Sequence, residues 1–215
     1  MKPLIITATD TDVGKTVVSA MLTLALDAIY WKPIQAGTAE STDRERVAEL
    51  TGLPESRFRP ERYILREPLS PHRAAELDGV EIEAHQLELP EDVPADRWLI
   101  IEGAGGVLVP INRRRLQIDL FARWRAPAIL CARTALGTIN HTLLSLEALK
   151  RRGIAVLGII FVGESIPDTE RTIIEFGGTK SLGRLPILPR LDASALNTAF
   201  AASFNRHDFE AAHER

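Results

Sequence analysis

The chain has 215 residues, 45% of them hydrophobic, and this length is enough to bury a sizeable core and favours one α/β domain over two. Its formal net charge of −3 and its pI of about 6.0 give no reason to propose a nucleic-acid surface, which needs clustered positive charge. No apolar run approaches the roughly 18 residues of a membrane helix, none forms a secretory leader, and Cys131 is a single cysteine, so we expect a cytoplasmic protein without membrane contact.

Short runs rich in Ile, Val and Leu recur along the chain and predict buried strands, because strands covered on both faces lose the alternation of apolar and polar residues. These runs are residues 4–6, 28–31, 98–101, 128–131, 156–162 and 181–188. Helical patterns lie between them, over residues 16–27, 43–51, 117–124, 138–152, 168–176 and 193–204. The alternation predicts a doubly wound, mostly parallel sheet with helices on both faces.

Two regions do not fit this alternation. Residues 53–96 are rich in proline and hold no long apolar run, so we expect a surface insertion with short helices, which in compact domains is often functional. Residues 207–215 are polar, and we expect a frayed tail there. With no repeat or linker between these segments, residues 1–215 are predicted to form a single domain.

A candidate phosphate-binding loop follows the first predicted strand. The sequence TATDTDVGKT at residues 7–16 ends in Gly14, Lys15 and Thr16 at a junction of strand and helix. Free N–H groups at the helix N-terminus can bind phosphate, a lysine can neutralise its oxygens, and a threonine hydroxyl can hold Mg²⁺. The usual spacing would require glycine at position 9, where this chain has Thr9.

The longer string from Thr9 to Thr16 resembles the loop of dethiobiotin synthetases, in which glycine precedes Thr-Asp-Thr, an acidic residue and Val-Gly-Lys-Thr. Ala8 stands where that family has its first glycine, a change that is tolerated if residue 8 needs no positive φ and its methyl meets no phosphate. The resemblance implies a P-loop NTPase-like fold, with Thr11 and Lys15 in catalysis. It also implies that ATP is bound by Asp12, Val13, Gly14, Lys15 and Thr16.

A second lysine stands at the end of the second predicted strand, in YWKPIQAG at residues 30–37. The carboxyl ends of parallel strands form the ligand crevice, and two ammonium groups, Lys15 and Lys32, can orient a developing anion. The stretch is similar to the Lys-Pro-Val-x-x-Gly motif of the same family, whose lysine is implicated in catalysis and substrate binding. Ala36 stands where many members have a Ser or Thr that touches the substrate.

Two carboxylates are candidate ligands of Mg²⁺, which favours oxygen donors. Glu102 ends a predicted strand and is followed by Gly103, Ala104 and Gly105, small residues that let a ligand approach the backbone. Asp43 could equally cap the following helix, or do both. Both match the metal ligands of the family by position, and the resemblance also assigns residues 102–105 to ATP binding.

The segment LGTINH at residues 136–141 follows a predicted strand and opens a long helix, whose free N–H groups could receive a carboxylate. It resembles the segment with which dethiobiotin synthetases bind the carboxylate tail of diaminopelargonate across a dimer interface. The resemblance therefore implies a homodimer with shared active sites. The substrate contacts that it implies in this segment are Gly137, Thr138, Ile139 and Asn140.

The region expected to bind the nucleotide base departs from the family. Many members have an Asn-Asp pair that reads adenine, whereas this chain has Val162 and Gly163, and valine cannot make the hydrogen bonds of asparagine. GRLPIL at residues 183–188 resembles the Gly-x-Ile-Pro segment of that base site, so Pro186, Ile187 and Leu188 are expected to contact the base through their backbone. His72, in a Ser-Pro-His motif of the family, has a structural or substrate-shaping role more readily than that of a general base.

Taken together, these motifs predict an ATP- and Mg²⁺-dependent ligase of biotin biosynthesis that closes a cyclic urea from 7,8-diaminopelargonate and CO₂. Two alternatives stay open. A related amide-forming synthetase would commonly carry a glutamine-hydrolysing domain with a nucleophilic cysteine, but Cys131 lies in a predicted strand. A regulatory or partitioning P-loop ATPase would often carry a lysine early in the loop, whereas residues 8–12 are Ala, Thr, Asp, Thr and Asp.

Overall fold

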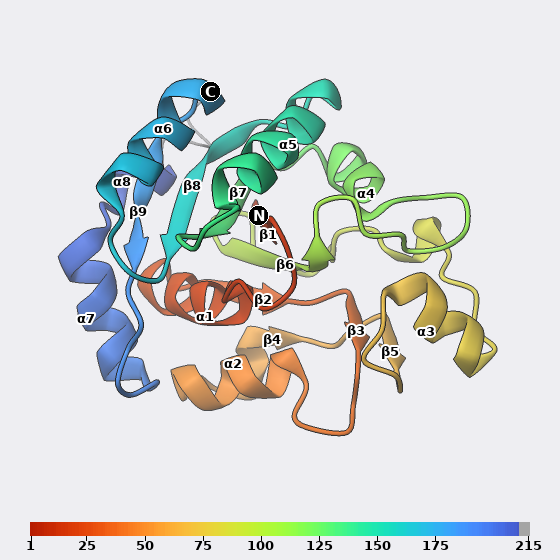
Figure 1. Cartoon of the computed structure of the whole chain (residues 1–215). Coiled ribbons are helices and arrows are strands. Elements are labelled where there is room, and N and C mark those ends of the chain that lie inside the picture. Colours follow the sequence, from red (N-terminus) through yellow and green to blue (C-terminus); the bar gives the residue numbers. More distant parts are fainter. Residues whose placement is uncertain (211–215) are drawn as a thin grey trace.

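A computed structural model of the chain describes residues 1–210 (Figure 1). Its largest sheet has seven strands in the order β4-β2-β6-β1-β7-β8-β9, and every neighbouring pair runs parallel. In chain order these strands are β1 (Lys2–Ala8), β2 (Ile29–Trp31), β4 (Phe58–Arg59), β6 (Trp98–Gly106), β7 (Ala128–Arg133), β8 (Val156–Val162) and β9 (Ser181–Leu185).

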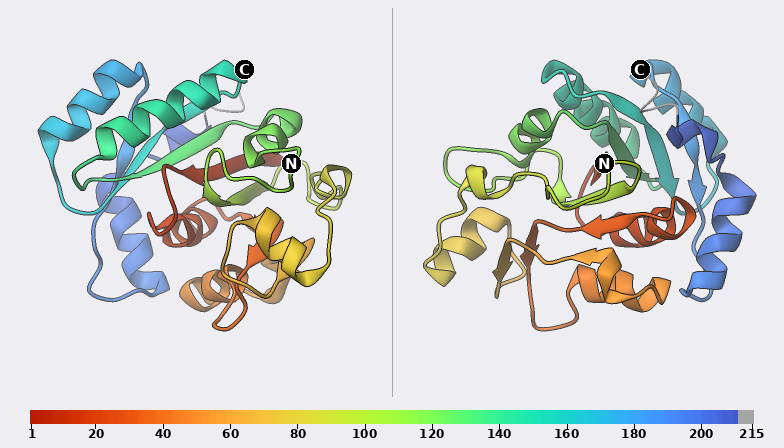
Figure 2. Two further views of the ribbon diagram at one scale, coloured as in Figure 1. Left: turned by 45° about the vertical axis from the view of Figure 1, so that its right-hand side comes forward. Right: turned by 180° about the vertical axis from the view of Figure 1, so that it is seen from behind.

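Helices cover both faces of this sheet, as the turned views of Figure 2 show. Four helices pack against one face: α1 (Lys15–Ala25), α2 (Asp43–Thr51), α7 (Ala193–Ser203) and α8 (His207–Glu210). Three lie against the other: α4 (Gln117–Trp124), α5 (Thr138–Arg151) and α6 (Pro167–Gly177). The two faces therefore bury two hydrophobic cores, one on each side of the sheet.

The central strand β1 explains the continuous apolar pattern of its sequence. Ile5 faces the core under α5 and α6, while Leu4 and Ile6 face the core under α1, and all three side chains are fully buried. β1 pairs with β6 on one side and β7 on the other. The carboxyl ends of these three parallel strands therefore lie at one edge of the sheet, where ligands bind in open α/β folds.

Residues 53–96 contribute one strand to the large sheet, because β4 pairs with β2 at its edge. The same region contains β5 (Tyr63–Leu65), which forms a small parallel sheet with β3 (Ile34–Ala36). Its helices are short: α3 (Pro71–Asp78) and the 3₁₀ turns η1 (Glu55–Arg57) and η2 (Ala84–Gln86). Figure 1 places β3, β5 and α3 side by side, beyond the edge of the main layers.

The predicted doubly wound parallel fold is confirmed, and α2, α4 and β8 have the predicted bounds. The two-to-three-residue strands β3, β4 and β5 were not predicted, because such short segments carry no periodicity. The last strand ends at Leu185 and not at residue 188. The prediction of a frayed tail is wrong for residues 207–210. They form α8, because Phe209 is fully buried against the α1 side of the sheet. Residues 211–215, which the prediction also covered, lie outside the described residues.

Among residues 1–210, the structure contains no helix with the length and apolar character that a bilayer span requires.

Candidate active site

The loop between β1 and α1 turns sharply at Gly14, which precedes the helix with a left-handed φ of 99°. A Cβ atom at this position would lie 3.1 Å from Cγ1 of Val162, so the loop needs glycine both for its backbone conformation and for its space. Ala8 ends β1, where it pairs in register with Cys131 and, after a register shift, with Gly106, and its φ is not positive. The alanine at position 8 therefore fits its backbone without strain.

Lys15, the first residue of α1, has little freedom in this site. Its Nζ donates a hydrogen bond to the main-chain oxygen of Asp10, 3.1 Å away, and the residue is 7% exposed. Burial lowers the pKa of Lys15, while the carboxylate of Glu102 acts in the opposite direction. The ammonium group is thus held at the turn of the loop, and α1 begins beside it without a side-chain cap on its N–H groups.

Asp10 is held from a second side by Arg133 at the end of β7. The guanidinium Nη2 of Arg133 donates to Oδ2 of Asp10 at 3.0 Å and to the carbonyl oxygen of Thr11 at 3.3 Å. The backbone N–H of Thr11 donates to Oδ1 of Asp10 at 2.8 Å. These bonds fix the first half of the loop, and the sequence analysis did not single out Arg133.

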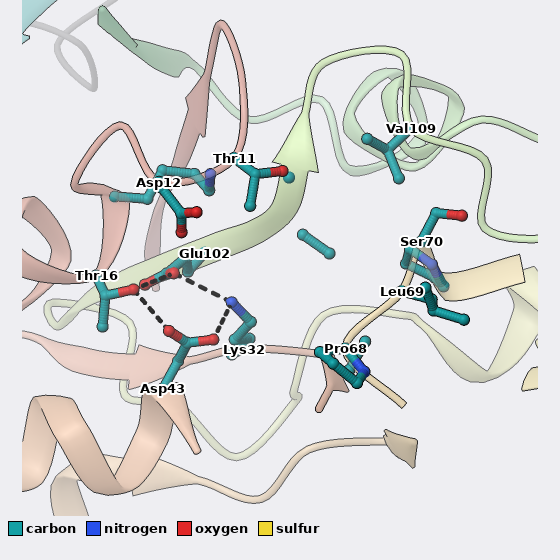
Figure 3. Close-up of a pocket in the computed structure, with 15 residues that line it drawn as sticks. Thr11, Asp12, Thr16, Lys32, Asp43, Pro68, Leu69, Ser70, Glu102 and Val109 are labelled. Atoms are coloured by element: carbon teal, nitrogen blue, oxygen red, sulfur yellow. Dashed lines mark hydrogen bonds and ion pairs between the residues drawn. The ribbon is translucent and has the colours of Figure 1, made fainter. Parts of the chain in front are cut away.

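Three oxygen-bearing side chains meet at the start of α1. The hydroxyl oxygen of Thr16 lies 2.7 Å from Oδ1 of Asp43 and 2.9 Å from Oε1 of Glu102 (Figure 3). Asp43 is not the cap of α2: Thr42 caps that helix, in a capping box with Glu45. The Asp43 carboxylate therefore faces the cluster. The alternative that Asp43 caps the N-terminus of α2 is wrong.

Lys32 lies between the same two carboxylates. Its Nζ is 2.5 Å from Oδ2 of Asp43 and 3.1 Å from Oε1 of Glu102 (Figure 3). Burial acts to lower the pKa of Lys32, but Glu102 and Asp43 outweigh it and the pKa lies above its ordinary value. Burial likewise opposes ionisation of Asp43, and the nearby ammonium of Lys32 still lowers its pKa. Both groups are charged at neutral pH.

Glu102 has a third partner that the sequence analysis missed. The hydroxyl of Tyr30, on β2, donates to Oε2 of Glu102 at 3.0 Å. Tyr30 is fully buried, and burial together with the charge of Glu102 raises its pKa well above the ordinary value. The phenol therefore stays protonated and remains a donor. No sequence pattern marks it, because a tyrosine in a buried strand reads as core.

Two glutamines hold the backbone around the carboxylates. Gln117, the first residue of α4, accepts from the N–H of Ala104 at 2.5 Å and donates to the oxygen of Gly106 at 3.3 Å. A Cβ at Gly103 would lie 2.9 Å from Nε2 of Gln117, so the glycine lets α4 approach. Gln35 accepts from the N–H of Asp43 at 3.2 Å. Neither glutamine was predicted.

A cavity of about 470 Å³ opens onto these groups. The loop and the start of α1 contribute Thr11, Asp12, Lys15 and Thr16 to its wall. The wall also includes Lys32, Ala36, Asp43, Glu102, Ala104 and Gly105. The insertion closes it from the far side with Pro68, Leu69, Ser70 and Pro71 (Figure 3). His72 is not in this wall; its Nδ1 lies 3.0 Å from the hydroxyl of Ser70.

The start of α5 does not reach this cavity in the single chain. Gly137 turns into the helix with φ 92°, and the side chain of Thr138 points inward, donating to the oxygen of Arg133 at 2.6 Å. Ile139 packs against the core, whereas Asn140 and the preceding Leu136 are exposed. None of the predicted substrate contacts between residues 137 and 140 lines the cavity that Lys32 and Ala36 line.

The predicted base-binding residues form a separate group at the ends of β8 and β9. Val162 is in contact range of Gly14, and the N–H of Gly163 donates to the oxygen of Leu185 at 3.0 Å. Pro186, Ile187 and Leu188 follow β9 directly. This group therefore lies beside the phosphate loop, on the side away from Lys32, although it is not part of the cavity wall.

Comparisons with known proteins show the family to which the sequence is similar. A family described as an AAA domain matches residues 2–195. The ATP-dependent dethiobiotin synthetase BioD of Rhodopseudomonas palustris strain HaA2 is 56% identical over 97% of this chain and 96% of its own length. The enzyme of the same name from Afipia carboxidovorans is 58% identical over 97% of this chain and 98% of its own length.

Solved structures with a similar fold are more distant in sequence. The chain resembles a ParA family ATPase from Chlorobium tepidum TLS with a TM-score of 0.53 at 11% identity, over 100% of this chain and 94% of the other. It resembles the septum site-determining protein MinD of Pyrococcus horikoshii with a TM-score of 0.52 at 13% identity, over 92% and 93%. At such low identity these likenesses show the P-loop NTPase-like fold alone.

Proposed function

The chain belongs to the family of ATP-dependent dethiobiotin synthetases and is a ligase, and we propose that it closes the cyclic urea of dethiobiotin from 7,8-diaminopelargonate and CO₂ in the cavity described above. The observation that carries the proposal is the meeting of Lys15, Lys32, Thr16 and two carboxylates at one cavity. Family membership identifies the reaction, and this cluster supplies the charges that it needs.

The reaction is a phosphoryl transfer followed by a ring closure. One amine of the diamine captures CO₂ as a carbamate, and an oxygen of the carbamate attacks the γ-phosphate of ATP and releases ADP. The second amine then attacks the carbon of the mixed anhydride and displaces phosphate, which closes the urea. Little covalent chemistry is left for the protein, so positioning and charge stabilisation carry the catalysis.

Lys15 and Lys32 would stabilise the charge that develops on the transferred phosphoryl group, because both ammonium groups face the cavity from fixed positions. Lys15 would exchange its bond to the Asp10 carbonyl for phosphate oxygens. Asp12, Val13, Gly14 and Thr16 would complete the phosphate contacts, with Gly103, Ala104 and Gly105 close to the nucleotide. Thr11 would lie beside the diamine, at the cavity wall.

The oxygens of Thr16, Asp43 and Glu102 fit Mg²⁺. The carboxylate oxygens of Asp43 and Glu102 lie 2.7 Å and 2.9 Å from the Thr16 hydroxyl oxygen, so three hard donors stand together. Mg²⁺ takes few protein ligands when phosphates and waters supply the rest. When bound, Mg²⁺ would neutralise phosphate charge and orient the β- and γ-phosphates.

The diamine would bind between Lys32, Ala36 and the phosphate loop, with its carboxylate on a second copy of the chain. The start of α5, with Gly137, Thr138, Ile139 and Asn140, does not line the cavity of its own chain, and the same segment of a partner would supply these contacts. A groove of about 450 Å³ runs between Thr11 and α5, and the exposed side chains of Leu108 and Leu144 line it. These features support a homodimer with active sites at the interface.

ATP is the nucleotide that the family uses, and Val162, Gly163 and residues 186–188 would surround its base. The side chain of Val162 offers no hydrogen bond to adenine, so we propose that the chain discriminates weakly among bases. Cys131 is a free thiol, which suits the cytoplasm, where thiols stay reduced.

The proposal is tested by phosphate release from MgATP and bicarbonate with and without 7,8-diaminopelargonate, with dethiobiotin followed by mass spectrometry. Phosphate and dethiobiotin should appear in equal amounts and only with the diamine. Phosphate release that ignores the diamine would contradict the synthetase and favour a regulatory ATPase. The sequence relatives at 56% and 58% identity favour the first outcome, because the ATPases that resemble the chain share its fold alone.

A further inference from the structure

The two carboxylate oxygens of Glu102 face different surroundings. Oε1 lies 2.9 Å from the Thr16 hydroxyl and 3.1 Å from Nζ of Lys32, on the side of the cavity (Figure 3). Oε2 accepts the hydrogen bond of the Tyr30 phenol at 3.0 Å, on the side of β2. The Glu102 side chain is itself 0% exposed, and Oε2 lies on the side away from the cavity, so water does not compete with the phenol for Oε2.

Tyr30 is held rigidly in the position from which it donates. It lies on β2 opposite Ile100 of the neighbouring strand β6, two residues before Glu102. Its ring packs edge to face against Phe58 of β4, with the centroids 6.5 Å apart and the planes at 65°. The whole residue is 0% exposed. The phenol therefore has no alternative rotamer in solvent, and its hydroxyl stays with Oε2.

We propose that Tyr30 is a positioning residue that retains Oε2 of Glu102, so that Glu102 offers one oxygen to the metal and the site prefers Mg²⁺ to Ca²⁺. Mg²⁺ requires compact octahedral coordination, whereas Ca²⁺ takes more oxygens and commonly binds a carboxylate through both of them. The inference depends on the metal site proposed above. It adds Tyr30, which is not a metal ligand but sets how many oxygens of Glu102 reach the metal.

Residues that hydrogen-bond to metal ligands commonly affect metal affinity strongly, because they fix the orientation of the ligand. Without the phenol, Oε2 would lose its donor in a place that water does not reach. The carboxylate would then turn to share both oxygens with the cation. We therefore expect Tyr30→Phe to weaken binding of a small divalent ion and to improve the relative binding of Ca²⁺.

The chain provides a matched control in its other tyrosine. Tyr63 is also buried, and its hydroxyl donates to Oε1 of Gln86 at 2.9 Å and accepts from the N–H of Glu83 at 2.9 Å. It lies on β5, and neither it nor its partners line the cavity. Tyr63→Phe thus removes a phenol hydroxyl from a buried ring of the same kind without touching the proposed metal ligands.

The probe is Mn²⁺, whose binding in the presence of a non-hydrolysable ATP analogue is followed by electron paramagnetic resonance. Competition with Mg²⁺ and Ca²⁺ then gives the ratio of their affinities without any turnover. Tyr30→Phe should weaken Mn²⁺ binding about tenfold, the lower end of such effects, and should shift the ratio several-fold toward Ca²⁺. Tyr63→Phe should leave both quantities at the wild-type values.

An unchanged ratio in Tyr30→Phe would overturn the inference. Failure of the metal site itself has a separate signature, because Glu102→Gln would then bind Mn²⁺ as tightly as the wild type. If Tyr30→Phe does not fold, 3-fluorotyrosine labelling of the wild type gives two ¹⁹F resonances, which Tyr63→Phe assigns. The Tyr30 resonance should differ between the Mg²⁺ and Ca²⁺ complexes, and identical positions would overturn the inference as well.

Discussion

Oε1 of Glu102 lies 2.9 Å from the hydroxyl oxygen of Thr16, although the two residues are separated by 86 positions in the chain. The parallel pairing of β1 with β6 brings them together, since Ile6 stands opposite Glu102 and the loop after β1 returns to start α1 at the same edge. The contact thus joins the phosphate loop to the carboxylate at the core of the proposed metal site.

Thr16→Val should weaken binding of Mn²⁺ with an ATP analogue by at least roughly 10-fold, the lower end of the loss when only a partner of a metal ligand is removed. The hydroxyl that we propose as a metal ligand is replaced by a methyl group of similar volume. Thr16→Ser keeps the hydroxyl and should restore most of the affinity. The measurement is the same paramagnetic resonance titration. Equal binding by the valine and serine variants would remove Thr16 from the metal site.

Lys32→Gln should lower kcat by about 10²–10³, the usual effect of losing one group that stabilises a developing charge. Glutamine is shorter than lysine but still polar, and it carries no charge, so the fold should persist while Asp43 and Glu102 lose their shared cation. Diamine-dependent phosphate release measures the effect. Lys180→Gln is the matched control, because Lys180 pairs with Asp208 away from the cavity; equal rates in both variants would exclude Lys32 from catalysis.

Gly14→Ala should raise KM for ATP roughly tenfold or more, since forcing an L-residue into the left-handed region costs about 1–2 kcal/mol and the new methyl would press on Val162 at 3.1 Å. Adding Val162→Ala should relieve only the steric part. Gly79→Ala is the control: it has φ 68°, with nothing within 4 Å of a Cβ, at the end of α3. A normal KM in Gly14→Ala would contradict the role of the loop.

Gln117→Leu should lower the free energy of unfolding by about 1–3 kcal/mol, because the N–H of Ala104 loses its buried acceptor. Urea denaturation measures the change. Gln86→Leu also removes an acceptor, that of the Tyr63 hydroxyl, but it should cost less because Gln86 is exposed and water can replace it. If the two variants are equally stable, Gln117 does not hold the backbone that follows Glu102.

Cys131 should resist iodoacetamide at pH 8 in the native protein and react fully in urea. Burial raises the pKa of its thiol to about 12, so the reactive thiolate forms only at pH values far above neutrality, and the unfolded chain regains an ordinary thiol. Mass spectrometry of the alkylated protein gives the extent of reaction. Rapid labelling of the native protein would contradict the position of β7 in the core.

The sequence alone determined the architecture and named most of the residues of the candidate site. Continuous apolar runs such as residues 156–162 predicted strands buried on both faces. The loop at residues 9–16 and Lys32 follow strand ends, where a parallel sheet collects its ligand-binding groups. The prediction that Glu102 ends its strand is wrong, because β6 continues to Gly106 through backbone pairing with β1. The family resemblance drawn from these motifs is confirmed by relatives of 56% and 58% identity. A local sequence pattern suffices to recognise a strand or a motif, because each is made of residues adjacent in the chain.

The tertiary structure decided what surrounds those groups. Tyr30 reads as a core residue until β2 and β6 place its hydroxyl against Glu102, 72 positions away. Gln117 reads as one polar residue at a helix start until α4 packs on Gly103. Strands as short as β4 carry no periodicity and exist because a neighbouring strand supplies their hydrogen bonds. Such contacts join segments that are far apart in the sequence. No local sequence pattern encodes which pairs of polar groups will be in contact.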